Sequence, residues 1–206
     1  MAPNKNSKVS RHKSRKKLWL AIGIIAIVII VFGVYEVIAN QSTSPTKVLL
    51  QTSMGDITIQ LRTDKPTTAT NFKNLVEQGK YDGTVFHRVI KGFMIQGGAI
   101  NESIPTIPDE IGNNNTNVAY TIAMAKTSQP NSATSQFFIN VADNGNSIID
   151  NAGTKFDSVY TVFGTVISGQ NVVDAISKVP VTANPYTGEN SQPIQPVTLI
   201  KATILP

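Results

Sequence analysis

The sequence contains no cysteine and only two histidines, His12 and His87. Without cysteine the chain can form no disulfide, no thiolate metal site and no cysteine nucleophile. Two histidines are also too few for a multi-histidine metal centre. We therefore expect neither a metal ion nor another cofactor, and any chemistry must come from other side chains.

Acidic residues are absent from the first 17 positions, where seven of the 18 basic residues lie. From residue 47 onward the chain has eleven basic and twelve acidic residues, a net charge of 11 − 12 = −1. The overall charge of +5 therefore describes a basic tail, residues 1–17. Since the remainder is nearly neutral, we expect no nucleic-acid partner.

Charged residues are also absent from residues 18–35, and the apolar run resumes after Glu36 as far as Ala39. At ~1.5 Å per residue, about twenty residues cross a ~30 Å hydrocarbon core. Trp19 and Tyr35 lie near the two ends, where aromatic rings favour the membrane interface. The pattern predicts one transmembrane helix over residues 18–39, in contact with membrane lipid.

The distribution of basic residues predicts how this helix is oriented. Seven basic residues precede the apolar run and only Lys47 follows it closely, so the N-terminus should stay cytoplasmic. We expect a single-pass protein of the cell membrane with its larger part outside the cytoplasm. Small residues around Ala39 leave open cleavage there and secretion, although the apolar run exceeds the ~7–15 residues of a signal core.

Residues 40–46 form a polar linker, and residues 47–206 have the pattern of one domain rich in short strands. Residues 48–50 and 57–61 predict a hairpin, while Pro66 and Gly79 suit the two ends of a helix. A second helix is expected over residues 170–178. Further strands are expected at 84–89, 93–97, 119–125, 136–141, 161–166 and 197–205. The pattern favours a mainly β fold, a closed eight-stranded antiparallel barrel capped by two helices.

Two segments combine polar and aromatic residues in a way that ordinary core strands do not. Residues 86–98 place the permanently charged Arg88 close to Phe93 and Met94, and residues 135–140 place Gln136 beside two phenylalanines. Burying an unpaired charge is costly. Arg88 therefore needs either a partner or a task.

With these segments in view, residues 47–206 resemble the cyclophilin family of peptidyl-prolyl cis-trans isomerases. The landmarks occur in the family's order along the chain. They are Met54-Gly55-Asp56, Pro66 through Asn71-Phe72, Phe86-His87-Arg88-Val89-Ile90, Gly92 through Gly98, Met124-Ala125, Ser135 through Ile139 and Tyr160 through Gly164. The resemblance implies the cyclophilin barrel and rotation of the peptide bond before proline.

The resemblance also implies the roles of individual residues. Arg88 is expected to donate a hydrogen bond to the proline nitrogen, which strengthens in the twisted transition state. Eight further positions match residues with a role in the family. Phe93, Met94, Phe138 and Phe156 correspond to the pocket for the proline ring. Gln96 and Gln136 correspond to residues that bind the peptide backbone and orient the arginine, His87 to a histidine that contacts substrate, and Tyr160 to a position where many relatives have histidine.

Two further positions, Ala125 and Lys126, match the stretch that hydrogen-bonds the residues preceding proline. Lys126 departs from the asparagine common in the family. A second departure concerns tryptophan, which drug-sensitive members have beside the pocket. Here Lys155 falls near that place and the only tryptophan is Trp19, so we expect weak inhibition by cyclosporin.

The leading hypothesis is a monomeric isomerase that binds proline-containing peptides and unfolded exported proteins and assists folding at the cell envelope. An alternative is a non-catalytic module or holdase that binds proline-containing segments. A purely structural envelope protein is a third hypothesis without support in the sequence. Arg88 together with both glutamines favours the enzyme, because a simple binder could use the apolar pocket alone.

Overall fold

The computed structural model describes residues 45–112 and 114–206. The predicted basic tail, the predicted transmembrane helix and most of the predicted linker lie outside these residues. Within them, no helix combines the length and the apolar character needed to cross a membrane.

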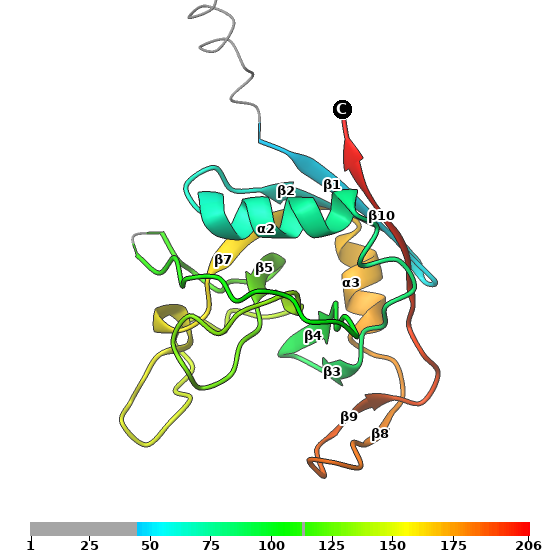
Figure 1. Ribbon diagram of the computed structural model, residues 1–206. Coiled ribbons are helices and arrows are strands. Elements are labelled where there is room, and N and C mark those ends of the chain that lie inside the picture. Colours follow the sequence, from blue (N-terminus) through cyan, green and yellow to red (C-terminus); the bar gives the residue numbers. More distant parts are fainter. Residues whose placement is uncertain (1–44, 113) are drawn as a thin grey trace, which may run out of the picture. The chain divides into compact units, whose positions relative to one another are not determined.

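Eight antiparallel strands form one curled sheet in the order β10-β1-β2-β7-β5-β6-β4-β3 (Figure 1). They are β1 (Lys47–Thr52), β2 (Gly55–Leu61), β3 (Arg88–Ile90), β4 (Met94–Gly97), β5 (Thr121–Met124), β6 (Phe137–Asn140), β7 (Val162–Ser168) and β10 (Leu199–Leu205). The predicted hairpin is confirmed, with Ser53 and Met54 between its strands. The expected strand at 84–89 is wrong in its extent, since β3 begins only at Arg88.

The sheet is not the closed barrel that the sequence suggested, because β3 and β10 remain its two edges. Between them lies a single isolated bridge, Val85 to Thr198. Backbone hydrogen bonds flank this bridge, from the N–H of Phe86 to the Val197 carbonyl and from the N–H of Leu199 to the Thr84 carbonyl. The pairing stops before β3, and the sheet is an open half-barrel.

The two predicted helices are present as α2 (Pro66–Glu77) and α3 (Gln170–Ile176). Pro66 begins α2, where its missing N–H costs no helical bond. Gly79 has φ +66° just beyond the end, and its N–H bonds the Val76 carbonyl. Within the domain, α2 packs against β7 and β10, and α3 packs against β2.

The inner face of the sheet and α2 enclose the main hydrophobic core. Fully buried rings of Phe72, Tyr81, Phe137 and Phe163 lie there with centroid separations of 5.1–5.6 Å. Gly98, at φ +72°, passes so close that an added Cβ would lie 2.8 Å from the Phe137 ring. The core is therefore closely packed and leaves no space for a side chain at position 98.

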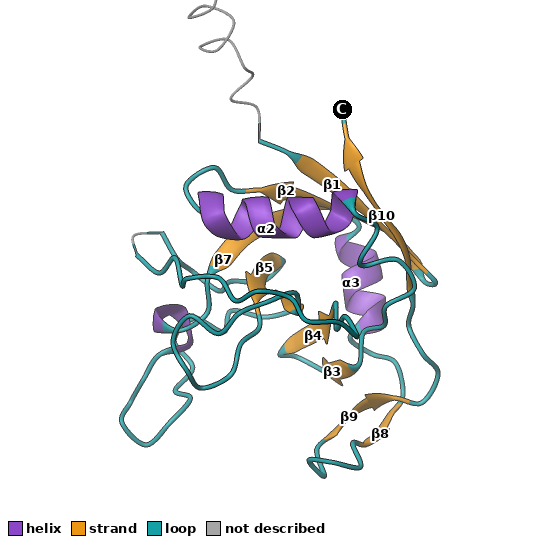
Figure 2. Cartoon of the chain, viewed as in Figure 1, coloured by secondary structure: helices purple, strands orange, loops and turns teal. Residues whose placement is uncertain are grey.

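A second, two-stranded sheet was not expected from the sequence. It consists of β8 (Val181–Ala183) and β9 (Asn190–Pro193), which flank the turn 184–189 near β3 (Figure 2). A short helical turn, η1 (Phe156–Ser158), was also missed. The turn between β8 and β9 brings Glu189, and η1 brings Phe156, to the outer face of the large sheet, where the candidate site lies.

Candidate active site

The candidate site follows from the alternation of side chains along strands. Because neighbouring residues of a strand point to opposite faces, Phe137 faces the core and Phe138 faces outward. The ladder places Phe138 opposite Gln96, and Gln96 opposite Arg88. Residues far apart in sequence thus form one row across β6, β4 and β3 on the outer face.

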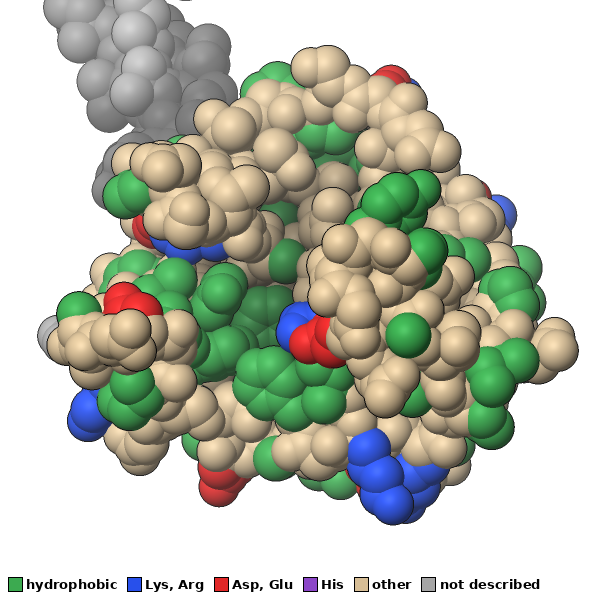
Figure 3. Space-filling model, turned by 90° about the horizontal axis from the view of Figure 1, so that it is seen from below, with side chains coloured by type: hydrophobic (Ala, Val, Ile, Leu, Met, Phe, Trp, Pro, Cys, Tyr) green, Lys and Arg blue, Asp and Glu red, His purple; other side chains and the backbone are tan. Residues whose placement is uncertain are grey.

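Nine of the eleven predicted site residues line one cavity of about 350 Å³ beside this row. They are Arg88, Phe93, Met94, Gln96, Ala125, Lys126, Phe138, Phe156 and Tyr160. Ile149 is the tenth lining residue and was not predicted. Figure 3 shows a hollow on this face with hydrophobic walls, where a basic and an acidic side chain touch at the border.

The remaining two predicted residues lie outside this cavity. Gln136 lines the adjoining cavity together with Gln96 and Lys126. His87 lines a separate cavity with Pro185 and Tyr186. Burial lowers the pKa of His87, which keeps its ring neutral at pH 7. Its predicted role as a substrate contact stays a prediction.

Aromatic rings form the apolar wall of the cavity. Phe138 makes edge contacts with Phe156 and Tyr160 at centroid distances of 5.5 and 5.4 Å, and Phe93 meets Phe156 at 5.5 Å. Burial raises the pKa of Tyr160, so its hydroxyl stays protonated at neutral pH. The wall is a preformed apolar surface of the kind that an aliphatic ring such as proline can fill.

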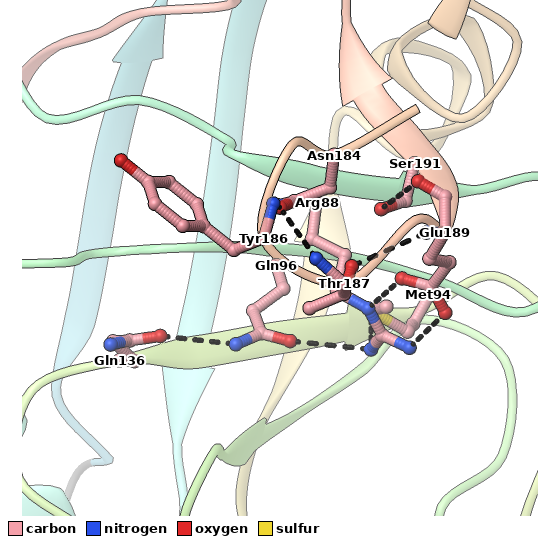
Figure 4. Close-up of polar contacts among 9 residues, drawn as sticks. All are labelled: Arg88, Met94, Gln96, Gln136, Asn184, Tyr186, Thr187, Glu189 and Ser191. Carbon is pink, nitrogen blue, oxygen red and sulfur yellow. Dashed lines mark hydrogen bonds and ion pairs between the residues drawn. The ribbon is translucent and has the colours of Figure 1, made fainter. Parts of the chain in front are cut away.

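Arg88 lies at the polar end of the cavity in a two-point ion pair with Glu189 (Figure 4). Its Nε and Nη2 groups donate to the two carboxylate oxygens at 2.6 and 2.8 Å. Hydrogen bonding from Arg88 lowers the pKa of Glu189, which is therefore ionised at neutral pH. The partner that a half-buried arginine requires is thus present.

Two glutamines continue the polar network away from Glu189. Arg88 Nη1 lies 3.4 Å from Gln96 Oε1, and Gln96 Nε2 donates to Gln136 Oε1 at 3.1 Å. The Met94 sulfur, a weak acceptor, lies 4.0 Å from Nη1. Of the five N–H groups of a guanidinium, two go to Glu189 and one to Gln96. Two remain without an oxygen acceptor among the described residues and are available to a ligand.

Lys126 is held by a second ion pair at the edge of the cavity. Its ammonium group donates to Asp109 Oδ2 at 2.6 Å, with the lysine side chain only 6% exposed. Asp109 also accepts the backbone N–H of Asn131, which fixes the loop after β5. The charge of Lys126 is therefore balanced by Asp109, and its side chain is held in place within the domain.

Sequence reasoning missed three residues around the cavity, Ile149, Asp109 and Glu189. Glu189 is 101 positions from Arg88 and lies in a segment without hydrophobic periodicity. One signal was available, because Glu189 is the only charged residue between Val181 and Gln195. Lys155 precedes η1 and does not line the cavity. The expected weak inhibition by cyclosporin stays a prediction.

The arrangement combines an apolar pocket, a fixed guanidinium with two available N–H groups and an amide relay. Such a site can bind a small apolar ring and place a charged donor against a nearby nitrogen or carbonyl oxygen. The nucleophile and base pairs that hydrolysis requires are not among the residues that line this cavity.

Comparison with known proteins gives one consistent family. Residues 47–204 match the family described as cyclophilin type peptidyl-prolyl cis-trans isomerase/CLD. A peptidyl-prolyl cis-trans isomerase of Acinetobacter baylyi is 43% identical over 81% of this chain and 89% of its own length. Peptidyl-prolyl cis-trans isomerase A of Dickeya dadantii is 44% identical over 76% of this chain and 84% of its own.

Solved structures agree with these sequence relatives. A Cryptosporidium parvum cyclophilin type peptidyl-prolyl cis-trans isomerase superposes with a TM-score of 0.65 at 25% identity, over 79% of this chain and 98% of its own. A second crystal structure of that protein, in the presence of the dipeptide Ala-Pro, gives 0.63 at 26% identity over 78% and 99%.

Proposed function

Because the chain belongs to the cyclophilin-type peptidyl-prolyl cis-trans isomerase family, we propose that it isomerises X-Pro bonds in exported or envelope polypeptides and so assists their folding. Peptidyl-prolyl isomerase is its enzyme class. The proposal concerns its substrates, its location and the residues that perform the reaction.

Arg88 is the catalytic residue of this proposal. Amide resonance gives the X-Pro bond a rotation barrier of ~18–20 kcal/mol. As the bond twists, the nitrogen lone pair localises and becomes a better hydrogen-bond acceptor. A charged donor aimed at it stabilises the twisted state more than the planar one. An acceleration of ~10⁵ requires a barrier lower by about 7 kcal/mol, of which one such donor can supply roughly half.

Substrate orientation must supply much of the remainder. The proline ring fits the apolar wall that Phe93, Met94 and Phe138 provide. The N–H groups of Arg88 without an oxygen acceptor then lie at the polar end of the same cavity. The presence of the dipeptide Ala-Pro with the Cryptosporidium relative is consistent with a proline-sized ligand.

The observation with most weight is the gathering of nine predicted residues around one cavity. We would measure isomerisation of a short X-Pro peptide by the full chain and by Arg88→Ala. We expect the variant to lose about 10²-fold in kcat/KM, the usual cost of one transition-state donor. Lys80→Ala removes the basic partner of Glu102 in an exposed ion pair and serves as a matched charge control.

The outcome separates the enzyme from the alternative binding module. A folded parent that is no faster than buffer, yet binds proline-containing peptides, would be a binding module or holdase. An Arg88→Ala variant with the parent's rate would remove Arg88 from the catalytic role.

The proposed location rests on the basic tail and the apolar run of the sequence. Export matters physically because X-Pro isomerisation takes ~10–100 s and can limit the folding of chains that have crossed a membrane. Reporter enzymes that work on only one side of a bacterial membrane, fused after Pro206, would test the orientation. Carbonate extraction would then distinguish an anchored chain, which stays with the membrane, from one cleaved near Ala39.

A further inference from the structure

The carboxylate of Glu189 occupies one whole edge of the Arg88 guanidinium. Nε and Nη2 form the side edge of the group, and each donates to a different oxygen of Glu189. Parallel charge-assisted bonds of this kind fix both distance and plane. The two N–H groups without an oxygen acceptor lie on Nη1 and Nη2, away from the occupied edge.

The backbone that presents Glu189 is held by its own hydrogen bonds. The side-chain oxygen of Asn184 accepts the N–H groups of Tyr186 and Thr187 at 2.9 and 3.3 Å. The N–H of Gly188 donates to the Asn184 carbonyl, and the N–H of Asn184 donates to the Glu189 carbonyl, both at 2.8 Å. β8 and β9 pair on either side of this turn. The carboxylate is therefore presented from a defined loop.

Other contacts of Arg88 are much weaker restraints. Gln96 lies 3.4 Å from Nη1 and the Met94 sulfur lies 4.0 Å away. The Arg88 side chain is 33% exposed, so packing alone does not fix its rotamer. A long arginine side chain has many rotamers, and an unrestrained one must lose that freedom in each transition state.

From these contacts we propose that Glu189 is a positioning residue for the isomerase reaction, which orients the Arg88 guanidinium toward the bound X-Pro bond. The proposal rests on the catalytic role of Arg88 given above. Glu189 does not touch the substrate in this arrangement. It acts by holding the plane of the guanidinium so that the Nη1 and Nη2 groups face the cavity.

A negative charge next to Arg88 also opposes catalysis, because it weakens the positive potential at the reacting bond. The geometry decides between these effects. The pair is about one-third exposed on both sides, so solvent screens the charge. Orientation is not screened, and a misplacement of about 1 Å can cost ~10²-fold in rate. The loss of orientation should therefore outweigh the gain in potential.

The test compares three variants of the full chain, Glu189→Ala, Glu189→Asp and Glu189→Gln. We expect Glu189→Ala to lower kcat/KM about tenfold, with the loss in kcat and little change in KM, since the apolar wall is intact. Glu189→Asp is one methylene too short to reach both donors and should behave like alanine. Glu189→Gln keeps one acceptor oxygen and should restore part of kcat.

A matched control removes the same kind of group elsewhere. Glu102→Ala deletes an exposed acidic partner of Lys80, and this variant should retain the parent kcat. A parent-like or higher kcat in Glu189→Ala would overturn the proposal, and a higher value would show that the carboxylate competes with the substrate for Arg88.

A second measurement is independent of turnover. In ¹⁵N NMR spectra of the full chain, the Arg88 Nε–H signal should exchange slowly with water in the parent and in Glu102→Ala. It should exchange faster, or broaden beyond detection, in Glu189→Ala. Slow exchange in Glu189→Ala would overturn the positioning role. A protected signal in a parent without isomerase activity would contradict the proposed function but leave the Arg88–Glu189 restraint standing.

Discussion

Phe137 and Phe138 are neighbours on β6, yet they belong to two different regions of the molecule. Phe137 packs edge-on against Phe72, Tyr81 and Phe86 inside the core. Phe138 packs in a smaller cluster on the outer face that borders the candidate active site. Both side chains are almost fully buried, so burial alone does not distinguish them. Side chains on the inner face of the sheet form the main core and stabilise the fold, whereas side chains on the outer face leave a cavity between them.

The largest effect on stability should come from the inner face. Phe137→Ala removes a ring enclosed on all sides, and the cavity left behind cannot be filled by solvent. We expect the free energy of unfolding to fall by about 3–5 kcal/mol, measured by urea denaturation. Phe137→Leu, with a smaller loss, keeps the test valid if the alanine variant does not fold. Its kcat/KM should stay within about twofold of the parent.

The same substitution one residue later should cost less stability and more activity. Phe138 borders an open cavity, so water can enter the space that Phe138→Ala creates. We expect a loss of about 2 kcal/mol in unfolding free energy, below the usual range for a core phenylalanine. The KM for a short X-Pro peptide should rise clearly, since the proline ring loses a wall. Equal stability losses at 137 and 138 would contradict the difference between the two faces.

Much of this two-faced arrangement was predictable from the sequence, because side chains alternate along strands. The resemblance placed Arg88, Gln96 and Phe138 in one site, and ladder register brings them into one row. The two ends of α2 were predictable from single residues. Pro66 and Gly79 have conformational requirements that are local to the chain.

The parts that failed depend on distant pairings that no local pattern reveals. The sheet stays open because only the isolated bridge of Val85 with Thr198 links the described residues beside its two edges, and this pairing follows from no local pattern. Glu189 meets Arg88 across 101 residues through a hairpin of polar residues with no hydrophobic alternation. The predicted membrane helix over residues 18–39 lies outside the described residues and stays a prediction.

The ion pair between Lys126 and Asp109 belongs to the outer face by position but resembles the inner face in its burial. It lies at the rim of the outer pocket but is largely buried, with side chains 6% and 16% exposed. Asp109→Asn leaves the lysine charge without its partner, so we expect a loss of about 2 kcal/mol in unfolding free energy. Glu77→Gln, which breaks the exposed pair with Lys73, should cost less than about 0.5 kcal/mol. Indistinguishable losses in the two variants would mean that the rim pair contributes no more than a surface pair.

A smaller effect is expected at Glu110, whose carboxylate caps the N-terminus of α2. Lys65, at the N-cap position, makes no side-chain cap bond. Instead the Glu110 carboxylate accepts the N–H groups of Thr67 and Thr68 and the Thr68 hydroxyl. Glu110→Ala should lower the unfolding free energy by about 1 kcal/mol, as for other lost N-caps.

The pH dependence of this cap gives a sharper test. Burial alone would raise the pKa of Glu110, but its hydrogen bonds from Thr68 and Thr67 outweigh that effect and lower the pKa below its ordinary value. A carboxylate with a lowered folded-state pKa stabilises fully above its unfolded value and loses that contribution as pH falls through the folded value. Urea unfolding at pH 7 and near pH 3 should therefore show the parent's advantage over Glu110→Gln shrinking in acid. An advantage of the parent that is the same at both pH values would mean that the charge of Glu110 does not contribute to the cap. A reduced kcat/KM of Glu110→Gln at pH 7 would show that the cap of α2 also affects the candidate active site.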